Sequence, residues 1–191
     1  MAKIDKEFIE TYIDKGIDLA NRRIFLIGDL DDDSIGIAIK ALYLMETESN
    51  VDPCELFINS SGGSITDTLA LYDVINTIKC PVHTFAVGQC MSAAPLLLAA
   101  GEKGERWVGE NCMFMTHQGS DDIAGKFSDL QSAVKFNIKL DKVWLELLTK
   151  NSKKPLPFWA RRSNKGPDFY FGAEEAIEWG IADAIWNEKQ Q

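Results

Sequence analysis

The feature of the sequence that most constrains its fold is an alternation between short apolar runs and longer amphipathic segments. The apolar runs predict buried strands at residues 23–27, 54–59, 82–87 and 112–116, and the amphipathic segments predict helices at 33–45, 65–78 and 126–150. Consecutive strands that are separated by helices lie parallel in one sheet, because each helix carries the chain back across it. The sequence therefore predicts an α/β fold.

Two of the predicted helices have a clear apolar face. In residues 65–78 apolar side chains recur every three or four positions, which indicates a helix that packs on the sheet. The segment 126–150 has a similar stripe but is longer than one domain requires. It predicts a helix that projects or packs against a neighbouring subunit, although an ordinary long surface helix fits the pattern equally well. The two stripes comprise Ile65, Leu69, Tyr72, Ile75 and Ile78, and Phe127, Leu130, Val134, Ile138 and Leu145.

Length and composition exclude several classes of protein. The 191 residues suit one domain, preceded by a short helix or arm at residues 1–21. Hydrophobic residues make up 46% of the chain and charged residues 26%, which is typical of a soluble globular protein. A net charge of −9 without a basic cluster argues against a nucleic-acid partner. The longest apolar run, Ala93 to Ala100, is too short to span a membrane.

The cysteines and the first residues indicate the compartment. The four cysteines include no C-x-x-C pair, and charged residues stand where a signal peptide needs an apolar run. We therefore expect a reducing, cytoplasmic location and no metal site.

Residues 59–64, with the sequence NSSGGS, lie between a predicted strand and a predicted helix. Paired glycines allow backbone N–H groups to approach a ligand closely, as in a cradle for an anion or oxyanion. The segment lacks the glycine spacing of a dinucleotide site and the lysine of a P-loop, so we expect no nucleotide and no other cofactor. A tight turn from strand to helix explains the same residues.

Ser92 follows a predicted strand and opens an apolar helix, within residues 88–95 (GQCMSAAP). N–H groups at the start of a helix can face a developing negative charge, so Ser92 is a candidate nucleophile. A serine that only caps the helix is the alternative. The G-x-S-x-G motif is absent, because Cys90 and Ala94 occupy its glycine positions.

A serine nucleophile needs a base, and the chain has two histidines. His83 stands at the start of a predicted strand, whereas His117 directly follows one, where α/β folds build their sites. We predict His117 as the base, with a structural histidine as the alternative. Asp168, at the junction of a turn and an aromatic strand, is the candidate carboxylate that orients the imidazole, although a turn aspartate needs no such role.

Several segments together give the chain a resemblance to the Clp protease proteolytic subunit. The resemblance runs from about residue 22 to 186, with the order and spacing of the segments preserved. The segments are residues 23–28 (RIFLIG), 58–64 (INSSGGS), Gly88-Gln89 with Ser92, 97–101 (LLAAG), 115–118 (MTHQ), and the late positions Ala173, Ala176, Gly180 and Asp183.

The resemblance implies that residues 22–191 form a serine endopeptidase domain with a crotonase-like α/β fold. Such subunits form seven-membered rings that usually stack in pairs, and they cleave peptides and unfolded proteins that an AAA+ unfoldase delivers. Carried over to this sequence, the resemblance implies a catalytic triad of Ser92, His117 and Asp168.

The resemblance also implies an oxyanion hole and a docking surface. The backbone N–H groups of Gly63 and Ala93 would bind the oxyanion. Phe57 and Trp107 would form two walls of an apolar pocket on the ring face, to which the unfoldase binds.

The sequence departs from the family pattern at three places that bear on function. Ser61 stands where a proline is common. Residues 119–122 (GSDD) replace a proline and paired glycines that help to bind the peptide strand. Pro167 replaces a charged residue that takes part in contact between rings.

Two other functions fit parts of this pattern. A crotonase-fold enzyme that acts on acyl thioesters uses the same cradle of N–H groups but needs no serine nucleophile. A non-catalytic ring subunit would lack a member of the triad, and none is missing here.

Overall fold

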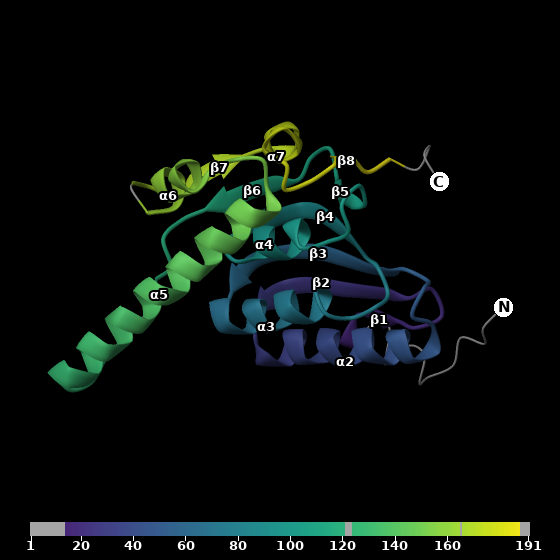
Figure 1. Cartoon of the computed structure of the whole chain (residues 1–191), viewed down its shortest axis with the longest axis horizontal. Coiled ribbons are helices and arrows are strands. Elements are labelled where there is room, and N and C mark those ends of the chain that lie inside the picture. The colour runs from purple at the N-terminus through teal and green to yellow at the C-terminus, as the bar shows by residue number, and fades with distance from the viewer. Residues whose placement is uncertain (1–13, 121–123, 165, 188–191) are drawn as a thin grey trace.

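The computed structural model describes residues 14–120, 124–164 and 166–187 (Figure 1). Its strands are β1 (Ile17–Asp18), β2 (Arg23–Leu30), β3 (Cys54–Gly63), β4 (Val82–Met91), β5 (Arg106–Val108), β6 (Met113–Thr116), β7 (Phe169–Phe171) and β8 (Ala184–Ile185). Its helices are α2 (Asp32–Glu48), α3 (Ile65–Ile75), α4 (Ala94–Ala99), α5 (Phe127–Asn151), α6 (Leu156–Asn164) and α7 (Ala173–Trp179).

An eight-stranded sheet organises the described part of the chain. The strands follow the order β1-β2-β3-β4-β5-β8, and every pair in this path is parallel except β1 with β2. β6 pairs with β4 in parallel, and β7 pairs with β6 antiparallel. Figure 1 shows α2, α3 and α4 along one face of this sheet. The predicted α/β fold with parallel strands is therefore confirmed.

Strands β3 and β4 continue beyond their predicted ends, past irregularities in their pairing. Ile58 pairs with Ala86 and Ser60 pairs with Cys90, so β4 advances four residues where β3 advances two. The first part of β4 pairs with β5, and the part after the irregularity pairs with β6. A bulge of this kind bends a strand and re-aims the residues that follow it. It carries the end of β4 into a separate ladder with β6 and β7.

The predicted apolar face of α3 is only partly correct. Tyr72 and Ile75 are buried as expected, and Leu69 and Ile78 are partly buried against the core. Thr68 and Leu71, which lie off the predicted stripe, are fully buried. The buried face is turned because α3 packs against both α2 and α4.

The long helix α5 leaves the body of the molecule along most of its length (Figure 1). Trp144, Leu145 and Leu148 are buried near its carboxyl end, whereas Phe127 is 88% exposed and Ile138 is 61% exposed. Of the predicted stripe, only Leu145 is buried. The prediction that this helix projects is confirmed.

The segment before β2 contributes to the sheet. Ile17–Asp18 forms β1 at its edge, and Ile17 is part of the hydrophobic core. Residues 1–13 of the predicted arm lie outside the described residues. No helix in the described ranges combines the length and the apolar character that crossing a bilayer requires.

A buried ion pair at the amino ends of β5 and β8 is joined to the carboxyl end of α5. The Arg106 guanidinium bonds the Asp183 carboxylate and also donates to the carbonyls of Asn151 and Gly180, both at 2.9 Å. Only 3% of the Arg106 side chain is exposed. Burial by itself would raise the pKa of Asp183, but the hydrogen bonds and charge of Arg106, together with the Gly104 N–H, hold the pKa below its ordinary value.

We predict that Asp183→Asn lowers the free energy of unfolding by about 3–5 kcal/mol, because it leaves a buried guanidinium without its counter-charge. Denaturant titration at fixed protein concentration measures the loss. Because the pKa of Asp183 is lowered in the folded protein, its contribution to the free energy of unfolding is complete above about pH 4. That contribution disappears as the pH falls through the folded-state pKa. Asp73→Asn, on the exposed side of α3, is the control. Equal stability of the two variants at pH 7 would contradict the role of the pair.

Candidate active site

The ladder of β4, β6 and β7 brings three of the predicted site residues to one place. Met91 pairs with Met115 in parallel, so Ser92 and His117 both follow the carboxyl ends of adjacent strands. Thr116 pairs with Phe169 in the antiparallel ladder, so His117 and Asp168 stand beside each other. The Ser92 N–H also donates to the Met115 carbonyl at 2.8 Å. Strand register alone therefore gathers residues from three distant parts of the sequence.

The side chains form a chain of polar contacts. Ser92 Oγ lies 2.8 Å from His117 Nε2, which is a hydrogen-bond distance. His117 Nδ1 lies 3.6 Å from Asp168 Oδ1, an ion-pair distance longer than a direct hydrogen bond. Asp168 is half exposed, whereas His117 is largely covered. His83 lies apart from this group, with its Nδ1 3.8 Å from Glu105 Oε2.

Ser92 has a strained backbone that is held by close packing. Its φ of 56° is in the left-handed region, which non-glycine residues adopt at a cost of about 1–3 kcal/mol and which is frequent at functional sites. Gly62 packs directly against it, since a Cβ built on Gly62 would stand 2.5 Å from Ser92 Cβ and 2.9 Å from the Met91 carbonyl oxygen. A Cβ on Gly63 would collide with the Leu30 carbonyl oxygen. The paired glycines thus permit β3 to approach Ser92.

A cavity of about 620 Å³ opens beside Ser92 and His117. Its wall includes the predicted oxyanion residue Gly63, and a smaller hollow next to it includes Ala93. One face of α5 closes the cavity through Phe136, Asn137, Leu140 and Asp141. Burial raises the pKa of Asp141, while hydrogen bonding by Gly119 and Gln118 and the proximity of His117 oppose that rise.

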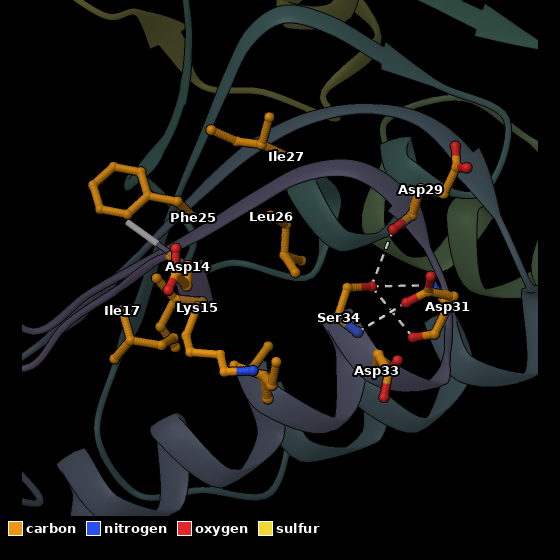
Figure 2. Close-up of a pocket in the computed structure, with 14 residues that line it drawn as sticks. Asp14, Lys15, Ile17, Phe25, Leu26, Ile27, Asp29, Asp31, Asp33 and Ser34 are labelled. Carbon is orange, nitrogen blue, oxygen red and sulfur yellow. Dashed lines mark hydrogen bonds between the residues drawn. The ribbon is translucent and has the colours of Figure 1, made fainter. Parts of the chain in front are cut away.

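A larger hollow of about 950 Å³ lies elsewhere, at the start of α2, and contains none of these side chains (Figure 2). Its acidic residues include Asp29, Asp31 and Asp33. Figure 2 shows Ser34 bonded to Asp31 and to the backbone of Asp29, and hydrogen bonding by Ser34 lowers the pKa of Asp31. This arrangement is a capping box for α2. Within the described residues, no group of three or more His, Cys, Asp or Glu side chains is placed to hold a metal ion.

The cysteines are poor alternative nucleophiles. Cys90 and Cys112 flank the site in sequence but are buried. Burial raises the pKa of the Cys90 thiol well above its ordinary value and that of Cys112 to about 12. The thiolate is the reactive form, so these side chains stay unreactive near neutral pH.

The two predicted docking residues lie on one row of the sheet. Phe57 pairs with Phe85 in β4, and Phe85 pairs with Trp107 in β5. The Phe57 ring stacks on Phe85 at 4.5 Å and on Phe25 at 5.1 Å, and Trp186 packs edge-on against it. Phe57 alternates along β3 with the buried Leu56 and Ile58, so this aromatic row faces away from the helices.

Sequence reasoning missed Asp141 and Ile65 as residues of the cavity wall. The sequence pattern places Ile65 on the face of α3 that packs on the sheet, but it lines the cavity at the start of that helix. Asp141 carries no signal in the sequence, because it is one of many polar residues on α5 and no motif distinguishes it.

A family model described as Clp protease matches residues 10–189 of the 191-residue chain. The matched range contains all of the strands and helices described above.

We predict that Gly62→Ala slows fluorophosphonate labelling of the protein by about 100-fold, because the added methyl group displaces Ser92 from His117. Gly28→Ala is the matched control. Its φ of 101° is close to the 104° of Gly62, but nothing lies within 4 Å of the added Cβ. Both variants should lose similar stability from backbone strain. Equally slow labelling of the two would show that strain, and not the contact with Ser92, is responsible.

Proposed function

The chain belongs to the Clp protease family and is a proteolytic subunit of that type, and we propose that it is a serine endopeptidase with Ser92, His117 and Asp168 as its catalytic triad. The 2.8 Å contact between Ser92 Oγ and His117 Nε2 is the observation that supports this most directly. It joins a nucleophile to a base, which is the arrangement that acyl transfer through serine requires.

The proposed mechanism follows from the positions of these atoms. His117 Nε2 accepts the Ser92 proton as Ser92 Oγ attacks the peptide carbonyl, and His117 then donates that proton to the leaving amine. The Asp168 carboxylate faces Nδ1 and favours the tautomer with a proton there, so that Nε2 is free to accept. Water then hydrolyses the acyl-enzyme by the same proton transfers.

We assign the oxyanion hole to the backbone N–H groups of Gly63 and Ala93. Gly63 lines the cavity together with Ser92, and Ala93 directly follows the nucleophile. Each such donor stabilises the transition state by about 2.7–4 kcal/mol. Any residue at this position except proline would supply the N–H group. Glycine is necessary because a side chain would collide with the backbone of Leu30.

The site favours peptide hydrolysis over the two alternative functions. An acyl-thioester enzyme of the same fold does not need a serine bonded to a histidine, whereas this chain has that pair. A non-catalytic ring subunit would lack part of the triad. All three residues are present and adjacent here.

We propose that the subunit acts in seven-membered rings that stack in pairs. Oligomeric assembly with an ATPase partner is general in the family. The projecting part of α5 carries apolar side chains, among them Phe127, Val134 and Ile138, that are at least half exposed in the single chain. Apolar surface of this kind is normally covered by a partner, and α5 is the part of the subunit that extends furthest from its body (Figure 1).

We further propose that an AAA+ unfoldase binds the aromatic row and delivers unfolded substrates to the chamber. The row consists of stacked aromatic rings, with Phe57 and Trp107 partly exposed, and interface hot spots are often built from aromatic side chains. No cofactor enters the proposed chemistry, since the serine, the histidine and the carboxylate supply every proton transfer.

We predict that Ser92→Ala and His117→Ala each lower peptide hydrolysis at least about a thousandfold, because members of a triad act as a unit. Hydrolysis of an unstructured fluorogenic peptide without nucleotide measures the loss. The double variant should be no worse than either single one. His83→Ala, which alters the other histidine, is the control. If His83→Ala were inactive and His117→Ala active, the assigned base would be wrong.

We predict that Phe57→Ala and Trp107→Ala each weaken unfoldase binding by about 2 kcal/mol or more, as expected for aromatic hot spots. Both should still hydrolyse short peptides without nucleotide, because the row is separate from the Ser92 cavity. Binding to the immobilised unfoldase and ATP-dependent degradation of a folded substrate are the readouts. Tyr43→Ala, which removes an exposed aromatic ring from α2, is the control. Full binding by all three variants would exclude the row as the docking surface.

A further inference from the structure

The cavity beside Ser92 contains one carboxylate that the proposed triad does not use. Asp141, on α5, lines it with Ser92 and His117, and its Oδ1 accepts a hydrogen bond from the Gly119 N–H at 3.3 Å. The described lining includes no lysine or arginine, and His117 is its other ionisable residue. A peptide side chain that enters the cavity therefore meets one acidic group and no fixed cation that competes for it.

The remaining wall of the cavity is largely apolar. Ile65 approaches from the start of α3, Met115 from β6, and Phe136 and Leu140 from one face of α5. These surfaces suit the methylene stem of a long side chain, while the carboxylate suits a cationic head. The volume of about 620 Å³ is within the range of ordinary ligand pockets and gives such a side chain ample room.

Partial burial makes the Asp141 carboxylate a stronger partner for a cation than an exposed carboxylate is. Burial raises its pKa, which reports the cost of holding the negative charge in this site. A cation that enters the cavity offsets that cost, and the attraction is less screened there than at the surface.

We propose that Asp141 is a specificity-determining residue that selects lysine or arginine at the position whose carbonyl is cleaved. This position is implied because the cavity reaches Ser92, to which that carbonyl becomes bonded. The proposal rests on the serine peptidase function proposed above. It gives the cavity a substrate class, namely peptides with a basic residue on the acyl side of the cleaved bond.

The test compares fluorogenic peptides that differ only in the residue before the cleaved amide, which is lysine, glutamine, methionine or glutamate. The wild-type protein should have a kcat/KM for the lysine peptide about tenfold above that for the methionine peptide, the gain expected from one charge-assisted hydrogen bond. The glutamate peptide should be the poorest substrate.

Three variants separate selectivity from structural effects. Asp141→Asn should remove the lysine preference, and Asp141→Glu, which keeps the charge, should retain it. Asp129→Asn removes one charge from the same helix away from the cavity and should leave the preference unchanged. The ratio of lysine to methionine turnover is the readout, because a general loss of structure lowers both rates together.

The outcomes distinguish a wrong assignment of Asp141 from a wrong proposed function. A wild-type protein that prefers methionine, or a lysine preference that survives Asp141→Asn, would overturn the assignment of Asp141 while leaving the peptidase intact. Absence of both fluorophosphonate labelling and hydrolysis of every peptide would instead overturn the proposed function.

Discussion

The change of partner along β4 is the constraint on which the site depends. Up to Ala86 the strand pairs with β5, and from Gln89 it pairs with β6 instead, while Cys90 still pairs with Ser60 of β3. Gly88, with a φ of 70°, allows the backbone to make this change. Without it, Ser92 would emerge at the edge of the main sheet, away from the β6–β7 ladder that carries His117 and Asp168.

The second constraint is the close approach of β3 to the end of β4. Gly62 leaves room for the Ser92 side chain, and Gly63 fits against the Leu30 carbonyl of β2. The surrounding contacts hold Ser92 in a backbone conformation that its side chain disfavours. The packing of the sheet thereby fixes the direction of the Ser92 hydroxyl group, whose Oγ lies 2.8 Å from His117 Nε2.

The position of α5 links the core to the cavity. Arg106 bonds the last carbonyl of the helix, at Asn151, and Trp144, Leu145 and Leu148 anchor the same end in the core. Asp141 lies one turn before these buried residues, where the helix starts to leave the body. The cavity wall is therefore rigid at this end, while the exposed remainder of the helix presents apolar side chains to the exterior.

The sequence by itself determined the alternation of strands and helices and the candidates Ser92, His117 and Asp168, because periodicity and local chemistry are visible along the chain. It left open whether the helix of residues 126–150 projects or lies along the surface, and the structure decided that it projects (Figure 1). Tertiary structure alone decided that β3 and β4 extend past their bulges, that α3 buries Thr68 and Leu71, and that Asp141 lines the cavity. These features depend on strand register and on contacts between segments distant in the sequence, such as the contact between Gly119 and Asp141. No local pattern encodes such contacts, since the same polar residue on a helix faces solvent or a cavity according to what packs beside it.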